Sequence, residues 1–274
     1  MDSAQSRTRL IAFSSGKGGV GKTFLSLNVA VALAQRGHSV MLFDGDMGLA
    51  NVHVLLGIHT EKDISDVLAG RCALAQTILK GPAGVRIVPG ASGKRDVAEL
   101  SMLELTRVLQ GLGSLVPAAD YIVIDTGAGI GTHVTTLAQL SDAIVVVVRD
   151  EPASLADAYG LIKVMYQEFG SQRFQIVVNG VSNPVRGNQI FERLQNVAMK
   201  FLGLPLELAG VIPQDSNAIA AIGRRDALLT AFPDSVGAMA VRRVAAKLEG
   251  LRVDAGSSPF LIDRLDAVSL GAVT

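Results

Sequence analysis

One segment of eight residues constrains this chain more than any other. Residues 16–23, GKGGVGKT, fit the pattern GxxxxGK[ST] and stand between an apolar run and a long helical run. In such a loop, backbone N–H groups and the positive end of the following helix surround phosphate oxygens. Lys22 then reaches the β and γ phosphates, and the Thr23 hydroxyl binds Mg²⁺. The segment predicts a site for a nucleoside triphosphate, formed by Gly16, Lys17, Gly18, Gly19, Val20, Gly21, Lys22 and Thr23.

Two other interpretations of this segment are weaker. Gly16, Gly18 and Gly21 also satisfy GxGxxG, the pattern of dinucleotide-binding loops, but that pattern requires no lysine followed by threonine. A glycine-rich turn without a ligand is disfavoured as well, because four glycines and two lysines in one tight turn are costly unless an anion is held there. A phosphate-binding loop is therefore preferred.

The rest of the chain predicts an α/β fold with a single doubly wound, mostly parallel sheet and helices on both faces. Short runs rich in valine and isoleucine recur between longer segments of helical period, which is typical of parallel strands buried on both sides. The fold is assigned to residues 1–250, and residues 251–274 form a linker and an amphipathic C-terminal tail. Strands are expected near 9–14, 39–44, 85–88, 120–125, 142–149, 174–179 and 208–212.

Helices are expected to begin near Gly21, Ser101, Thr132, Ser154 and Arg186, with a last core helix from Ala238 to Leu248. Two of these starts have the form of a capping box, in which a serine and an acidic residue three positions later satisfy each other's backbone N–H groups. The two pairs are Ser101 with Glu104 and Ser154 with Asp157.

Composition excludes several classes of function. The chain of 274 residues has 25 Lys plus Arg and 25 Asp plus Glu, so no net field draws the whole protein to nucleic acid or acidic lipid. The single cysteine, Cys72, excludes an internal disulfide and an iron-sulfur site held by cysteines of one chain, which suits a reducing cytoplasm. No uncharged apolar run of 18 residues occurs, so no membrane-spanning helix is expected.

Acidic residues follow two of the predicted strands. Asp44 and Asp46 lie at the end of the second strand, and Asp125 ends the run Tyr121–Asp125. Ligands bind outside the carboxyl ends of strands in open parallel sheets, so Asp125 is expected to hold Mg²⁺ directly or through water, with Asp44 supporting it. For Asp44 and Asp46, a role as turn and helix caps is the alternative.

Lys17 stands where an ordinary phosphate loop needs no charge, and KGGVGKT resembles the deviant Walker A motif of the MinD/ParA family. The resemblance implies that Lys17 reaches across a homodimer to the partner's nucleotide, with two ATP molecules at the interface. It also makes the segment around Asp46 switch I, in which Asp46 orients the attacking water and supports Mg²⁺ through water. ATP hydrolysis is then slow, dependent on Mg²⁺ and coupled to dimerisation.

Further site residues follow from the same resemblance. No [NT]KxD element that would recognise guanine follows the later strands, and the positions that flank adenine in MinD-like ATPases hold Asn179, Pro213 and Asp215. Glu151, Ser154 and Asp157 match positions that line the MinD dimer face. Taken alone, Asn179 and Asp215 are ordinary turn formers, and Ser154 with Asp157 could simply cap a helix.

Four segments, 44–57, 84–93, 125–131 and 150–159, resemble one branch of that family, the flagellar-number regulators known as FlhG, FleN or YlxH. The similarity extends from about residue 8 to 250. It implies an ATPase that limits flagellar number or placement with an FlhF-type GTPase, flagellar switch-complex proteins and a flagellar transcription activator as partners. Many members carry an N-terminal DQAxxLR segment that stimulates FlhF, and residues 2–9, DSAQSRTR, depart from it.

A DNA-partition or other cargo-positioning ATPase of ParA type is the competing hypothesis. DNA binding needs a cationic face, for which the candidates are Arg224, Arg225, Arg242, Arg243 and Lys247. Acidic residues lie nearby at Asp226 and Glu249, so a solvated helix face is preferred and no direct nucleic-acid contact is expected.

The tail contains one amphipathic stretch. After Pro259, a helix would place Leu261, Leu265 and Val268 on one face. The resemblance makes this a membrane-targeting segment, so residues 259–274 are expected to bind weakly and reversibly to the inner face of the cell membrane. Asp263 and Asp266 outnumber Arg264, which weakens the attraction to anionic lipid, and docking on the protein's own core is the alternative.

Overall fold

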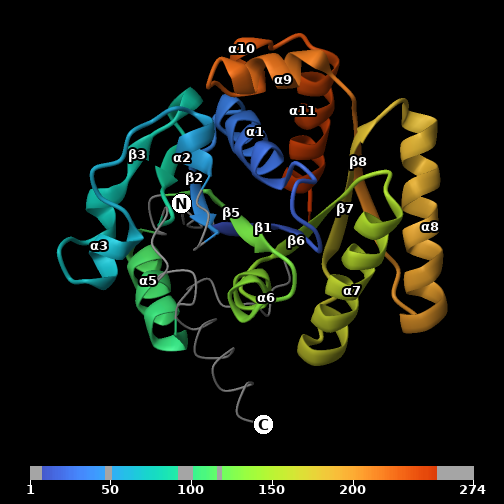
Figure 1. The fold of residues 1–274 in the computed structure, drawn as a ribbon, viewed down its shortest axis with the longest axis horizontal. Helices are drawn as coiled ribbons and strands as arrows, with labels where there is room; N and C mark the ends of the chain where they lie inside the picture. The colour runs from blue at the N-terminus through green and yellow to red at the C-terminus, as the bar shows by residue number, and fades with distance from the viewer. Residues whose placement is uncertain (1–7, 47–50, 92–100, 116–118, 252–274) are drawn as a thin grey trace, which may run out of the picture.

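The computed structural model describes residues 8–46, 51–91, 101–115 and 119–251 (Figure 1). Within them the chain forms one sheet of eight strands in the order β3-β4-β2-β5-β1-β6-β7-β8. Every neighbouring pair is parallel except β3 with β4. The strands are β1 (Arg9–Ser15), β2 (Val40–Gly45), β3 (Leu79–Lys80), β4 (Arg86–Val88), β5 (Tyr121–Ala128), β6 (Ala143–Val148), β7 (Phe174–Val181) and β8 (Glu207–Pro213).

The strands form where the apolar runs are, because both faces of the sheet are covered. All six residues of β2 and all six of β6 are buried, as continuous valine and isoleucine runs require. The seven predicted strands are confirmed, and each lies within about two residues of its expected bounds at the amino end. The two-residue strand β3 was not predicted, since two residues carry no measurable periodicity.

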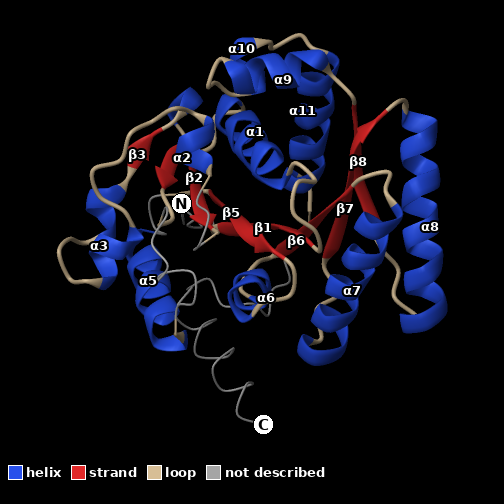
Figure 2. Ribbon diagram, viewed as in Figure 1, coloured by secondary structure: helices blue, strands red, loops and turns tan. Residues whose placement is uncertain are grey.

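Helices cover the sheet in two layers (Figure 2). One apolar core joins one face of the sheet to α1, α10 and α11, and a second joins the opposite face to α5, α6, α7 and α8. The doubly wound fold class is thus confirmed. The long helices are α1 (Lys22–Gln35), α5 (Met102–Leu115), α6 (Thr132–Gln139), α7 (Pro152–Phe169), α8 (Pro184–Leu202), α9 (Ser216–Gly223) and α11 (Val236–Glu249); the short ones are α2 (Val52–Leu55), α3 (Ile64–Leu68) and α10 (Leu228–Ala231).

Of the two predicted capping boxes, one is confirmed and the other is wrong. The capping box before α5 is present, since Glu104 N–H donates to Ser101 Oγ at 3.3 Å and Ser101 N–H donates to Glu104 Oε2 at 2.8 Å. The second box is wrong: α7 begins at Pro152, and the Ser154 hydroxyl lies inside its first turn, where it accepts the Arg149 N–H at 3.0 Å. Proline has φ already set for the first helical position, so it begins the helix earlier than the serine would.

The same effect shifts the start of α8. Asn183 is its N-cap and accepts the N–H of Arg186 at 2.9 Å, and Pro184 is the first helical residue. The predicted start near Arg186 is therefore two residues late. Among the described helices, none is both long and apolar enough to cross a bilayer.

The topology places one crevice at the carboxyl end of β1. The chain leaves β1 through α1 toward β2 on one side, whereas β5 continues through α6 to β6 on the other side of β1. Connections that diverge in this way open a space beyond the strand ends, and ligands of doubly wound folds bind there. The loops after β1, β2 and β5 surround that space.

Candidate nucleotide-binding site

The loop after β1 is tight, and three contacts explain its glycines. Gly21 is the N-cap of α1 with φ 91°, and a Cβ there would lie 2.4 Å from Asn179 Nδ2. A Cβ on Gly16 would lie 2.2 Å from the backbone carbonyl of Asp157 in α7. The Asn179 amide donates to the carbonyl oxygen of Val20 at 2.7 Å and so fastens the loop to the end of β7. Side chains at these positions would expel the loop from its place.

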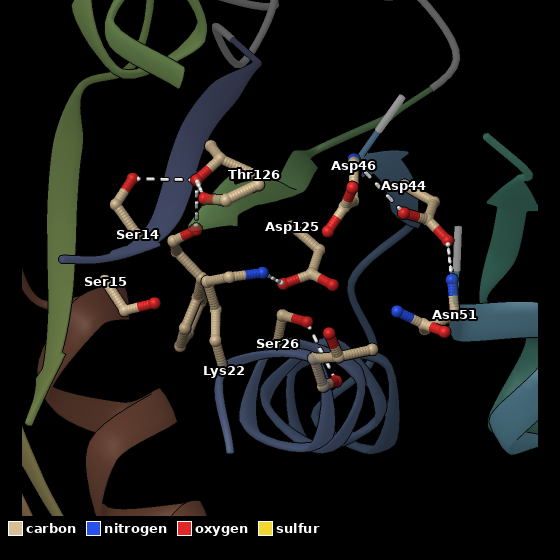
Figure 3. A network of polar contacts seen from close by, with 12 residues as sticks. Ser14, Ser15, Lys22, Ser26, Asp44, Asp46, Asn51, Asp125 and Thr126 are labelled. Carbon is tan, nitrogen blue, oxygen red and sulfur yellow. Dashed lines mark hydrogen bonds and ion pairs between the residues drawn. The ribbon is translucent and has the colours of Figure 1, made fainter. Parts of the chain in front are cut away.

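A buried ion pair lies beneath the loop (Figure 3). Lys22 Nζ is 2.8 Å from Asp125 Oδ1, and the two side chains are only 8 % and 1 % exposed. Asp44 is the residue of β2 that lies directly beside Asp125 of β5 in the sheet register. The sequence motifs therefore meet at adjacent strand ends, with two carboxylates and one ammonium group in a nearly water-free space. Breaking such a pair by removing one partner is costly.

Asp44 has a structural role that the sequence suggested only as the alternative. Its Oδ2 accepts the N–H groups of Asn51 at 2.9 Å and Val52 at 3.0 Å, and its Oδ1 accepts the Asp46 N–H at 3.3 Å. The carboxylate thereby holds the first turn of α2 against the end of β2. Residues 47–50 of the predicted switch I segment lie outside the described residues.

This arrangement predicts a pH dependence of stability. Burial and then the neighbouring Asp125 carboxylate raise the pKa of Asp44 from 3.8 to about 7. Between about pH 4 and about pH 7, Asp44 is protonated in the folded protein and ionised in the unfolded chain. The free energy of unfolding therefore falls as the pH rises through this range, by up to about 4 kcal/mol. Urea unfolding of the ligand-free protein at pH 5 and pH 8 measures this slope. Asp44→Asn lacks the titrating group and should flatten it, and an unchanged slope in that variant would contradict the assignment.

The crevice is a cavity of about 960 Å³, and the phosphate loop forms one end of it. Gly18, Gly19, Gly21, Lys22 and Thr23 line this end together with Asp46 and Ala128 from the ends of β2 and β5. Residues from three strand ends therefore converge on one space, although Asp44 and Asp125, which were also expected there, do not line it. A cavity of this size accommodates a nucleotide-sized ligand.

The residues present fit a magnesium ion. Asp125 Oδ2 is buried and has no hydrogen-bond partner among the described residues, and an acceptor left in that state needs a cation or a donor. Thr23 lines the cavity, and Asp125 lies behind its wall, where it contacts Lys22, another lining residue. No group of three His, Cys, Asp or Glu residues that could hold a metal occurs among the described residues. Mg²⁺ is commonly held by one or two carboxylates plus substrate phosphates, and Thr23 with Asp125 suits that arrangement.

Lys17 points to α7 in this structure. Its ammonium group is 2.9 Å from Glu151 Oε2, each side chain being 42 % exposed, and Arg149 Nε lies 3.9 Å from the other Glu151 oxygen. The hydrogen bond from Lys17 lowers the pKa of Glu151. Nothing in the sequence signals this pairing, because the two residues are 134 positions apart. Of the other proposed dimer-face residues, Ser154 is buried and Asp157 is exposed.

The three residues proposed to flank adenine are engaged in the fold. Asn179 uses its amide group on Val20, and Pro213 ends β8. Asp215 accepts the N–H of Asn217 at 2.9 Å as the N-cap of α9 and the N–H of Gly237 at 2.9 Å from α11. None of the three lines the cavity, and their contact with adenine stays a prediction.

A phosphate loop that follows the central strand β1, together with acidic residues at the ends of β2 and β5, defines the class of P-loop nucleotide-binding proteins. Residues 11–228 match the family model CbiA, described as the CobQ/CobB/MinD/ParA nucleotide binding domain. The chain is 40 % identical to antiactivator FleN of Pseudomonas aeruginosa over 94 % of its own length and 93 % of FleN. It is 33 % identical to flagellum site-determining protein YlxH of Helicobacter pylori, covering 88 % of this chain and 82 % of YlxH. The protein belongs to the MinD/ParA family and to its FleN/YlxH branch.

Solved structures agree with this placement. MinD of Pyrococcus horikoshii in complex with Mg-ADP superposes with a TM-score of 0.73 at 25 % identity, covering 89 % of this chain and 96 % of that one. MinD in the MinC:MinD complex of Aquifex aeolicus gives 0.72 at 25 % identity, covering 91 % and 98 %. A ParA family ATPase from Chlorobium tepidum, at 22 % identity and a TM-score of 0.72, shares the fold.

Proposed function

We propose that this protein is a MinD-like ATPase that regulates flagellar number or placement through ATP-dependent dimerisation and partner binding. The observation that carries the proposal is the buried Lys22–Asp125 pair under a phosphate loop that holds a second lysine, Lys17. The identity to FleN and YlxH over most of each chain supports the flagellar role. MinD of P. horikoshii was solved with Mg-ADP, which supports ATP and Mg²⁺ as the ligands here.

The residues of the site divide the work of hydrolysis. Lys22 exchanges its contact with Asp125 for the phosphate oxygens, which are the stronger anion, and the loop N–H groups surround the same phosphates. Asp125, once released, would hold Mg²⁺ together with Thr23, and the ion would neutralise charge on the phosphates. Asp46, at the end of β2, orients the attacking water, and Lys17 from the partner protomer completes the positive environment of the transition state.

Lys17→Ala is expected to retain ATP binding and to lose ATP-dependent dimerisation. The Lys17 side chain does not line the cavity of its own protomer and is partly exposed, so it is available to a partner protomer. Glu151→Gln, in contrast, removes the anion that holds Lys17 within one chain, so dimerisation should tighten several-fold. Size-exclusion chromatography with ATP and Mg²⁺ measures both. Lys80→Ala, an exposed lysine on β3, is the matched control. A Lys17→Ala protein that dimerises like the parent would overturn the sandwich arrangement.

Partners and membrane association extend the same proposal. MinD of Aquifex aeolicus was solved in a cell division complex with MinC, which supports partner binding here. For this chain we infer an FlhF-type GTPase, flagellar switch-complex proteins and a flagellar transcription activator as the partner classes. Residues 259–274 would provide weak, reversible binding at the inner face of the cell membrane. Both this tail and residues 2–7 of the DQAxxLR comparison lie outside the described residues.

The partition alternative is less well supported by the basic side chains. Arg242 donates to the carbonyl oxygen of Pro233, and Lys247 donates to that of Leu208. The guanidinium of Arg224 lies 4.5 Å from the centre of the Phe232 ring. Three of the five candidate DNA-binding cations thus have contacts within the molecule, which gives them a structural role that requires no DNA.

The test of the flagellar role is genetic. The chromosomal gene is replaced by the Lys22→Ala form, and flagella per cell are counted by electron microscopy beside the wild type and a deletion. We expect the substitution to reproduce the deletion, with altered number or placement. Normal flagella in the deletion would favour the partition alternative, which an electrophoretic mobility shift of DNA with and without ATP then tests.

A further inference from the structure

The cavity has a second end that the phosphate chemistry does not use. It lies between α2 with its following turn and the carboxyl end of α9, and it is called here the α2/α9 lobe. Its walls are apolar and basic, and the acidic residue that lines the cavity, Asp46, lies at the phosphate end. The lobe is formed by Val54, Gly57, Ile58, His59, Ile222 and Arg225.

Arg225 occupies a backbone conformation that usually belongs to glycine. Its φ is 57°, and Ala83 is the other non-glycine residue with positive φ in the described part of the chain. Opposite it, Gly57 has φ 64°, and a Cβ at Gly57 would lie 2.5 Å from Arg225 Cδ. The arginine stem therefore packs on a position that only glycine leaves open. A strained backbone at a helix end is retained where its side chain is needed.

The charge of Arg225 is uncompensated within the described part of the chain. No ion pair or side-chain hydrogen bond of Arg225 occurs among residues 8–46, 51–91, 101–115 and 119–251, whereas the adjacent Arg224 stacks on Phe232. Around it, Val54 is 56 % exposed and Ile222 is 45 % exposed, although both line the cavity. A guanidinium between exposed apolar side chains is complementary to a ligand with a carboxylate and an apolar group next to it.

We propose that the α2/α9 lobe binds an acidic, apolar peptide segment of another protein. A carboxylate of that segment pairs with Arg225, and an apolar side chain packs between Val54 and Ile222. The lobe is also linked to the nucleotide site: the N–H groups of Asn51 and Val52, at the start of α2, are held by Asp44, two residues from Asp46. This part of the proposal rests on the proposed ATPase function: a segment bound in the lobe would act through α2 and Asp44 on Asp46, the residue that orients the attacking water.

The test uses the full chain and a fluorescent peptide of Glu and Leu residues at helical spacing, with a Lys and Leu peptide as the second probe. Fluorescence anisotropy should show that the acidic peptide binds and that the basic peptide does not. Arg225→Glu and Arg225→Gly should each weaken it by about tenfold, since each variant removes the cation that pairs with the peptide carboxylate. Arg225→Gly suits the left-handed backbone, so loss of folding cannot explain its effect. Arg243→Glu, an exposed arginine on α11 with the same change of charge, should leave binding unchanged.

Several results would overturn the proposal. Equal binding of the basic peptide, or equal loss in Arg243→Glu, would show an unspecific surface. A tenfold loss of ATP affinity in Arg225→Glu would assign the lobe to the nucleotide, and loss of the ATP dimer with unchanged peptide binding would assign it to a second copy of this chain. ATP binding by the wild type is measured separately, so failure of the ATPase proposal is distinguishable from failure at this lobe.

Discussion

Lys22→Ala is expected to abolish nucleotide binding and to destabilise the ligand-free protein at the same time. The ammonium group is the fixed cation of the phosphate loop, and its loss should weaken ATP binding at least about 100-fold. In the absence of nucleotide it is also the partner of Asp125, 2.8 Å away and buried. Removing one member of a buried pair leaves an uncompensated charge and costs about 3–5 kcal/mol. Isothermal titration with ATP and urea unfolding measure the two effects.

A double variant separates these two effects. Lys22→Ala with Asp125→Asn removes both charges, so most of the lost stability should return while nucleotide binding stays absent. If the double variant is as unstable as Lys22→Ala alone, the ion pair is not the source of the instability. Strong ATP binding by either variant would contradict the placement of Lys22 at the phosphates.

Asp46→Ala should produce the opposite combination, in which ATP binds and the dimer forms but hydrolysis stops. Asp46 lines the cavity beside the ends of β2 and β5, and it forms no part of the phosphate loop. Losing the group that orients the water should lower the hydrolysis rate at least about 100-fold. Size-exclusion chromatography with ATP should then show a persistent dimer, because the bound nucleotide is not consumed.

The control for Asp46→Ala is Asp234→Ala, which removes an exposed acid outside the cavity and should leave hydrolysis at the parental rate. Asp44→Asn gives a further comparison, since this neighbour is fully buried and bonded to the backbone of α2. Asp44→Asn should change the free energy of unfolding more than it changes the rate of ATP hydrolysis. Parental hydrolysis by Asp46→Ala would remove the switch I assignment.

Most of the fold was accessible to sequence reasoning because its signals are local. A strand buried on both faces is typically a continuous apolar run rich in β-branched residues, and β6, AIVVVV, has this pattern. The capping box at Ser101 and Glu104 acts within one helical turn and was predicted correctly. The predicted start of α7 was wrong because two local signals for a helix start lie close together, and Pro152 comes before Ser154 in the chain. A capping box at Asp63 and Asp66 does begin α3, and its pattern was visible in the sequence.

The sequence by itself determined the phosphate loop, seven of the eight strands, and the acids at the strand ends, because each of these depends on residues close together in the chain. Only the tertiary structure decided which groups face one another. It placed Lys22 on Asp125 and Lys17 on Glu151, pairs that are 103 and 134 residues apart. It also explained Gly16 by the backbone of Asp157 rather than by phosphate alone. Such pairings depend on how the sheet and helices pack in three dimensions, so the local sequence pattern does not predict them.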